Sequence, residues 1–309
     1  MPPLRVLPWI SRCASLALVG IVVWTGVGCR YIGQCRKSSD ESIAQTRQLA
    51  LQGKDAQQHG RWDQAEAIFA AAVVQGPRDE RARCGYAEAL WQRGARDEAV
   101  AHMEEAVKLS GNDPERVVQL GNMHFALGNL DRAGKQADKA IAANRELPLA
   151  WVLRGKVLQA RGEFAAAQAA FHRALGYQPQ FPEAQLALAE VYRQEGRPQR
   201  ALATLQALEA SYPPHGAPVE VLVPQGLALG QLGRHADAAR TLARAAERGN
   251  PSADLLYELA RAQLQAGDAT AARLTTLAAL DRDPGHARSR QLQAEIASLP
   301  ATMAATTLR

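Results

Sequence analysis

Aromatic residues make up only 5% of this 309-residue sequence, although hydrophobic residues make up 47%. The apolar side chains are therefore mostly those of alanine and leucine, which favour helices over strands. The scarcity of aromatic residues beside so much alanine and leucine predicts an all-α protein.

Cysteine is also scarce, with four residues in the chain. Cys13 lies in a hydrophobic leader and Cys84 lies in a helical pattern, so only Cys29 and Cys35 are near each other. Their spacing matches no zinc-binding or redox pair. The cysteines therefore indicate no disulfide framework, and we expect no metal site.

Enzyme motifs are missing from the sequence. It contains no phosphate-binding glycine loop, no HExxH, no GxSxG and no CxxCH. The seven histidines are scattered along the chain. We therefore expect a protein that is not an enzyme, with no cofactor and no small-molecule substrate.

The formal net charge is +5, but the chain has no basic stripe. Lysines and arginines are spread along the chain and interleaved with acidic residues, as on solvated helix faces, and form no stripe with aromatic residues between them. Nucleic-acid binding usually requires a clustered basic surface. The charge pattern therefore argues against a nucleic-acid partner.

The N-terminus carries a targeting signal. Arg5 and Arg12 precede an uncharged run of 17 residues, 13–29, and further basic residues follow it. This length is at the low end of what crosses a hydrocarbon core of roughly 30 Å. We predict that residues 1–29 are a signal peptide or membrane anchor and that residues 30–45 are a polar tether. The protein is then membrane-associated, on the extracytoplasmic side of a bacterial cell envelope.

The end of the apolar run suggests how the anchor is made. Gly26-Val27-Gly28-Cys29 resembles the lipobox of bacterial lipoproteins, in which the cysteine is acylated. Gly28 and Cys29 fit that pattern, whereas Gly26 stands where leucine is usual. Three routes stay open: lipidation of Cys29, a retained membrane helix, and ordinary cleavage.

The rest of the chain repeats itself. A glycine is followed five residues later by an alanine seven times, and successive glycines are 34 residues apart, except for one spacing of 37. The pairs are Gly60 and Ala65, Gly94 and Ala99, Gly128 and Ala133, Gly162 and Ala167, Gly196 and Ala201, Gly233 and Ala238, and Gly267 and Ala272. Chance does not produce such a series.

This spacing, with a small residue twelve positions before each alanine, resembles the tetratricopeptide repeat. The resemblance implies an all-α fold, a right-handed superhelical solenoid of about seven helix pairs with a C-terminal capping helix. We expect the repeats over residues 46–286, the capping helix over 287–299 and a disordered tail over 300–309.

Each position has a physical reason beside the resemblance. A glycine at the end of the first helix can take the left-handed conformation that stops it. Small residues let the two helices cross closely. Larger residues four positions after the alanine then fill the space between helices. These are Phe69, Met103, Phe171, Leu205 and Leu242.

Proteins of this family hold peptide segments in a groove lined by the first helix of each repeat. The register of the repeats gives a mixed lining of apolar and polar groove positions. The candidate site residues are Val118, Asn122, Phe125, Val152, Lys156, Leu186, Glu190, Val223, Leu227, Tyr257 and Arg261. Exposed apolar residues suit a peptide-binding surface, but the same residues could simply pack between adjacent repeats.

The leading functional hypothesis is a membrane-associated scaffold that binds a protein or peptide partner during cell-envelope assembly. One alternative is a basic binder of nucleic acid or anionic surfaces, whose affinity would fall steeply with salt. Another is an accessory subunit of an envelope enzyme complex. Which partner binds, and in which pathway, does not follow from the sequence.

Overall fold

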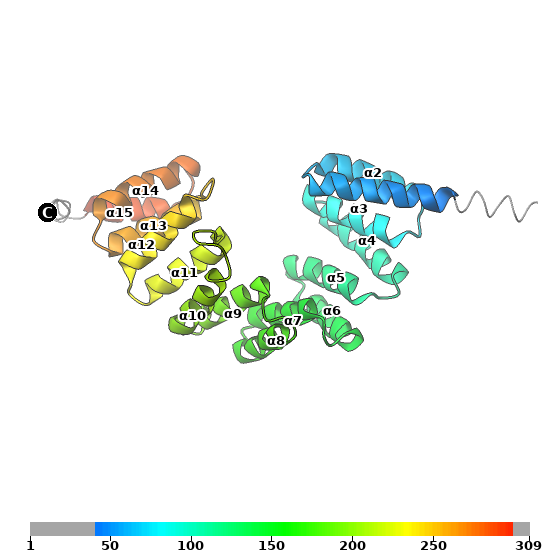
Figure 1. The fold of residues 1–309 in the computed structure, drawn as a ribbon. Coiled ribbons are helices and arrows are strands. Elements are labelled where there is room, and N and C mark those ends of the chain that lie inside the picture. The colour runs from blue at the N-terminus through cyan, green and yellow to red at the C-terminus, as the bar shows by residue number, and fades with distance from the viewer. Residues whose placement is uncertain (1–40, 299–309) are drawn as a thin grey trace, which may run out of the picture. The chain divides into compact units, whose positions relative to one another are not determined.

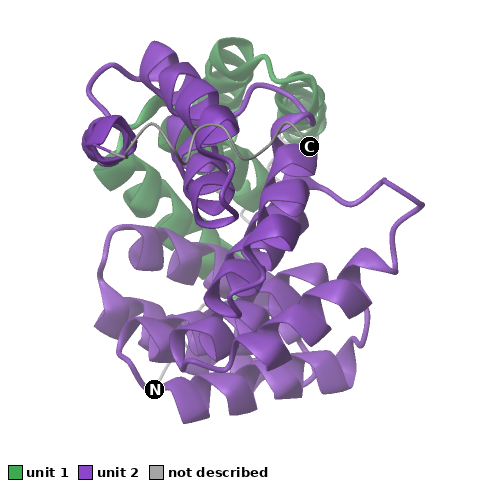
Figure 2. Cartoon of the chain, turned by 90° about the vertical axis from the view of Figure 1, so that its left-hand side faces the viewer, with its two compact units in different colours: residues 1–112 green, residues 113–309 purple. Residues whose placement is uncertain are grey.

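A computed structural model describes residues 41–298, and all regular structure in that range is helical. The chain forms two compact units, residues 1–112 and 113–309 (Figure 2). In the first, a helix over residues 41–58 precedes α2 (Trp62–Gln75), α3 (Glu80–Arg93) and α4 (Arg96–Leu109). The second contains α5 (Pro114–Ala126), α6 (Leu130–Ala143), α7 (Pro148–Ala160), α8 (Phe164–Tyr177), α9 (Pro182–Gln194), α10 (Pro198–Glu209), α11 (Val219–Gln231), α12 (His235–Ala246), α13 (Ala253–Gln265), α14 (Ala269–Arg282) and α15 (Ala287–Ser298).

The helices pack as consecutive pairs (Figure 1). In the second unit the first helices of neighbouring pairs also contact one another, from α5 through α13 to α15. No two second helices in the described part of this unit are in contact. The first helices therefore form one continuous layer, which we call the first-helix layer. The all-α fold of paired helices predicted from the sequence is confirmed.

The turns inside the pairs depend on glycine. All seven glycines of the repeat have a left-handed backbone, with φ between 71° and 92°. A residue with a Cβ atom is strained in this conformation. The glycines are Gly60, Gly94, Gly128, Gly162, Gly196, Gly233 and Gly267. The predicted role of these glycines in ending the first helix is confirmed.

The interior of each pair is built from small residues and one larger side chain. The seven alanines of the repeat are at most 1% exposed. In the pair of α7 and α8, Phe171 is fully buried, and a Cβ atom added to Gly155 would lie 2.5 Å from its ring. Glycine at position 155 thus lets the two helices approach until the ring fills the gap.

Local signals start several of the helices. The Asp113 carboxylate accepts hydrogen bonds from the main-chain N–H groups of Glu115 and Arg116, at 3.1 and 3.2 Å. Ser252 accepts one from the N–H of Leu255 at 3.2 Å. Such caps satisfy N–H groups that have no partner inside the helix. They fix where α5 and α13, two members of the first-helix layer, begin.

A charged junction joins α10, α11 and α12. Glu209 accepts hydrogen bonds from Gln225 Nε2 at 2.9 Å and from Arg244 Nη2 at 2.8 Å. Burial alone would raise the pKa of Glu209, but the bonds from Arg244 and Gln225 outweigh it and lower the pKa below its ordinary value. The folded protein therefore favours the ionised carboxylate.

Changing Glu209 to glutamine is expected to lower the free energy of unfolding by about 1–2 kcal/mol near neutral pH, because a charge-assisted bond is lost. Since the folded-state pKa is depressed, the parent's advantage is present above the unfolded pKa and is lost as pH falls through the folded pKa. Urea unfolding of both proteins at pH 7 and at pH 3 checks this. An equal difference at both pH values would contradict it.

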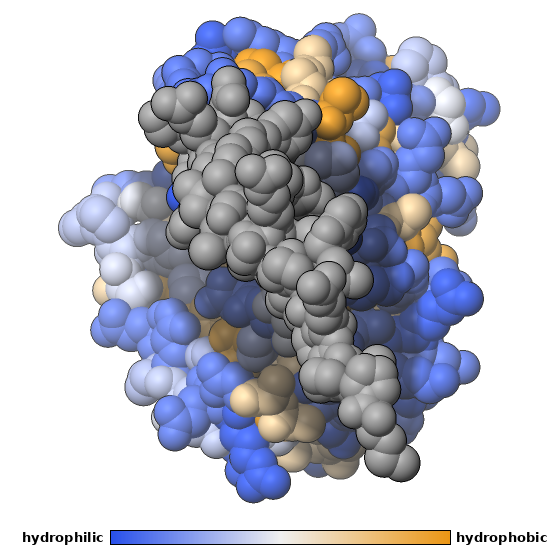
Figure 3. Space-filling view, turned by 90° about the vertical axis from the view of Figure 1, so that its right-hand side faces the viewer, coloured by the Kyte–Doolittle hydropathy of each residue, from blue (hydrophilic) through white to orange (hydrophobic). Residues whose placement is uncertain are grey.

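Most apolar side chains are directed inward. On the side of the molecule in Figure 3 the surface is mostly hydrophilic, and the apolar areas in view are small and separate. Large hydrophobic residues that are exposed in the described part of the chain are therefore informative about function.

Candidate functional site

A cleft opens on the first-helix layer between α11 and α13. Its volume is about 550 Å³. The apolar part of the lining consists of Val219, Val223, Leu227, Ala245, Pro251 and Leu255. A cavity of this size holds one or two side chains of a partner segment. We call it the α11–α13 cleft.

The cleft lies next to an irregular part of the repeat sequence. The spacing of 37 residues falls just before α11, where Pro213, Pro214 and Pro218 stiffen the connection. On the other side, residues 248–252 connect α12 to α13 and line one wall. The cleft therefore lies beside the point at which the repeat spacing changes.

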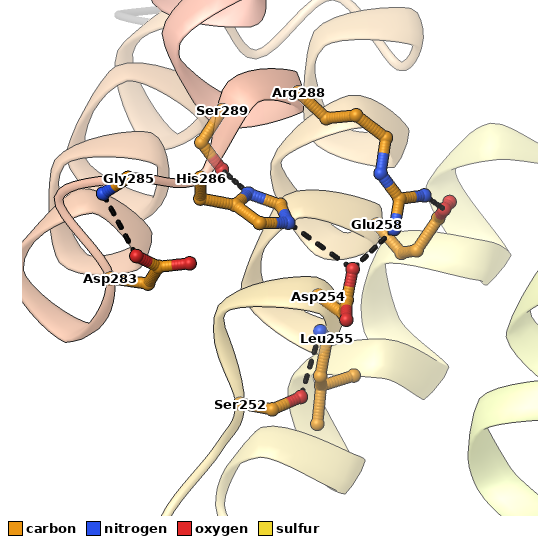
Figure 4. A network of polar contacts seen from close by, with 9 residues as sticks. All are labelled: Ser252, Asp254, Leu255, Glu258, Asp283, Gly285, His286, Arg288 and Ser289. Atoms are coloured by element: carbon orange, nitrogen blue, oxygen red, sulfur yellow. Dashed lines mark hydrogen bonds and ion pairs between the residues drawn. The ribbon is translucent and has the colours of Figure 1, made fainter.

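Charged side chains surround the apolar floor. Glu220, Asp254 and Arg288 occupy the second position of α11, α13 and α15, and all three line the cleft. Arg288 forms ion pairs with Asp254 and, at 3.6 Å, with Glu258 (Figure 4). Arg261 is 2.8 Å from the other oxygen of Glu258. Most of these charges are thus compensated within the protein, so the cleft as a whole is close to neutral.

The network continues to the start of α15. His286 Nε2 lies 3.2 Å from Asp254 Oδ1, and His286 Nδ1 lies 2.7 Å from Ser289 Oγ (Figure 4). Serine, histidine and aspartate in this order resemble a hydrolytic triad. Ser289 is fully buried, however, so its hydroxyl cannot reach a substrate. The three residues instead fix the first turn of α15 against α13.

Tyr257 links this network to the predicted groove. The Arg288 guanidinium lies 5.0 Å from the centre of the Tyr257 ring, in cation–π contact. The ring of His286 also packs edge-on against the ring of Tyr257, with the ring centroids 5.9 Å apart. The predicted residues Tyr257 and Arg261 are therefore held in place beside the cleft that Val223 and Leu227 line.

The other predicted groove residues lie on α5, α7 and α9. Asn122 is exposed, as is Arg261 on α13, whereas Phe125, Lys156, Leu186 and Glu190 are half-buried. Lys156 Nζ donates a hydrogen bond to Glu183 at 2.5 Å, and Glu190 binds Arg193 at 2.6 Å. Their charges are therefore already paired.

Val118 and Val152 differ from the rest of the predicted set. Each is only 2% exposed, because neighbouring members of the first-helix layer pack over them. They offer a partner almost no surface. These two residues therefore pack between adjacent repeats and do not form part of an exposed groove.

Sequence reasoning did not single out Asp254, Glu258 or Arg288. Asp254 and Arg288 are 34 residues apart and occupy the same position in successive repeats. The repeat spacing could therefore have indicated that they lie on the same face of the first-helix layer. Cys29 and the apolar run of the leader lie outside the described residues. Within residues 41–298 no helix is long and apolar enough to cross a membrane, and no group of three potential ligands is placed to hold a metal ion.

Paired helices, a continuous layer of first helices and an open cleft on that layer define a helical-repeat protein. Models of the tetratricopeptide repeat match residues 51–114, 158–219 and 223–287, together more than half of the chain. The chain belongs to the tetratricopeptide repeat family, whose members are scaffolds for protein interaction.

One relative matches about half of the chain. Cellulose synthase operon protein C of Pseudomonas fluorescens (strain SBW25) is 31% identical over 173 residues. The match covers 53% of this chain and 14% of that protein, so the chain spans only a small part of the relative's length.

Solved structures share the fold. A tetratricopeptide repeat protein from Parabacteroides merdae has a TM-score of 0.62 and 16% identity, over 82% of this chain and 98% of that one. PilW, described as a widely conserved type IV pilus biogenesis factor, has a TM-score of 0.52 and 18% identity, over 80% of this chain and 97% of that one. At these identities the similarity concerns the fold.

Proposed function

We propose that this protein is a membrane-associated scaffold of the bacterial cell envelope that holds an apolar segment of a partner protein in the α11–α13 cleft. The observation that carries the proposal is the cleft itself, an apolar floor that opens to solvent on the first-helix layer. An apolar side chain buried there would stabilise the complex by the hydrophobic effect.

The distribution of charge supports a protein partner over nucleic acid. Residues 41–298 contain 30 lysines and arginines and 30 aspartates and glutamates. The net positive charge therefore comes from the terminal segments and not from the folded repeats. Binding that depends on phosphate contacts would require a basic surface on the repeats. We expect the affinity for the partner to change little with moderate salt.

The membrane part of the proposal rests on the leader. Its apolar run and flanking arginines would direct the chain to a membrane, and Cys29 would carry the lipid if the lipobox is used. The names of cellulose synthase operon protein C and of PilW fit an envelope setting.

Photo-crosslinking in native membranes tests the proposal. A benzoylphenylalanine replaces Glu220, at the exposed edge of the cleft, in the full chain. The matched control carries it at Ala203, which is exposed on α10, outside the first-helix layer. We expect a discrete protein adduct from position 220 and none from position 203. Equal labelling from both positions, or crosslinks to nucleic acid, would overturn the proposal.

A further inference from the structure

The last two described helices form a second surface, separate from the α11–α13 cleft. Between α14 and α15 lies a cavity of about 350 Å³. Its lining includes Arg273, Leu277, Arg290, Ala294 and Ile296. We call these residues, with the neighbouring Leu274, the terminal surface.

Helix α15 has the features of a first helix. It packs on α13 and α14 as earlier first helices pack on the preceding pair. Its Ala294 is in register with the small residues at which first and second helices cross, which are all buried. Those residues are Gly121, Gly155, Ala189, Gly226 and Ala260. Ala294 is exposed, because in the described part of the chain no second helix covers α15.

Two leucines make this surface apolar. Leu274 is 65% exposed and Leu277 is 47% exposed on α14. The earlier second helices of this unit carry no large apolar residue at the same two positions. They carry Lys135 and Asp138, Ala169 and His172, Ala203 and Gln206, and Arg240 and Ala243. A polar cap that only shields the array from water would not expose two leucines here.

The charge of the terminal surface has one sign. Arg273 and Arg290 line the cavity, and no acidic residue does. Neither arginine has an ion-pair partner within residues 41–298. Arg290 donates a hydrogen bond from Nε to the carbonyl of Pro284 at 3.0 Å, which holds its side chain at the edge of the cavity. An occupant with carboxylates beside its apolar residues would complement this surface.

We propose that the terminal surface binds an acidic amphipathic helix of another protein, which lies along α14 and α15 over Leu274 and Leu277. The chain's own residues 299–309 suit the surface poorly, because they contain Arg309 and no acidic residue. A symmetric second copy would bring up a surface of the same positive charge. An amphipathic helix that lays its apolar face in an apolar groove is a common mode of recognition.

Fluorescence anisotropy of two labelled 14-residue helical peptides, added to the full chain, tests the inference. Both have leucines at i, i+3, i+4 and i+7; one has glutamates beside them and the other has lysines. We expect the acidic peptide to bind about tenfold more tightly. Changing Leu274 and Leu277 to glutamine should weaken it about tenfold, and Arg273→Gln with Arg290→Gln should abolish the preference.

Matched variants keep this test interpretable. Leu109→Gln removes a leucine that is 37% exposed in the first unit and should leave peptide binding unchanged, as should Val223→Asp in the α11–α13 cleft. Circular dichroism checks that each variant is folded. Equal affinity of the two peptides would overturn the inference. So would self-association that Leu274→Gln with Leu277→Gln abolishes, or acidic-peptide binding that appears only when residues 299–309 are removed.

Discussion

Changing Phe171 to alanine is expected to lower the free energy of unfolding by about 3–5 kcal/mol. The ring is fully buried and fills the space that Gly155 leaves between α7 and α8. Its removal leaves a cavity that small neighbours cannot fill, because the adjoining repeat positions are alanine and glycine. Urea unfolding followed by circular dichroism measures the effect.

The control for this prediction lies on the same helix. Tyr177 is 40% exposed at the end of α8, so Tyr177→Ala should cost about 1 kcal/mol or less. If both substitutions lower the free energy of unfolding by the same amount, the buried ring of Phe171 does not hold α7 and α8 together. The account of how each repeat is packed would then be wrong.

Changing both Val223 and Leu227 to aspartate is expected to weaken binding of the crosslinked partner about a hundredfold. Each substitution removes an apolar contact and places an unpaired carboxylate in the floor of the cleft. A loss of about 1.4 kcal/mol at each position corresponds to a factor of ten. Surface plasmon resonance with the purified partner measures the change.

Ala203→Asp adds the same charge on the exposed face of α10 and should leave the affinity unchanged. Because Val223 and Leu227 are half-buried, the double variant must also give the circular dichroism spectrum of the parent. An unchanged affinity in a folded double variant would mean that the partner binds elsewhere.

The repeat register predicted the interior of the helix pairs well. Spacing alone identified the glycines that adopt a left-handed backbone and the alanines that are buried, because both properties depend on contacts within one repeat. Phe171 and Leu242, assigned to the space between helices, are at most 1% exposed. Local periodicity is sufficient for these features.

The surface was harder to predict. Val118 and Val152 share a register position with Val223, yet only Val223 is accessible. The difference arises from how closely the next first helix packs, and that depends on neighbouring repeats. The ion pairs of Arg288 with Asp254 and Glu258 likewise join α15 to α13, so neither helix alone indicates them.

Hydrogen–deuterium exchange of the full chain, with and without the crosslinked partner, tests the central claim most directly. If the partner is held in the α11–α13 cleft, bound protein should show slower exchange in residues 219–231 and 253–265. Exchange in α6 and α8 should be unchanged. Protection of α6 and α8, or no protection of α11 and α13, would contradict the scaffold mechanism proposed here.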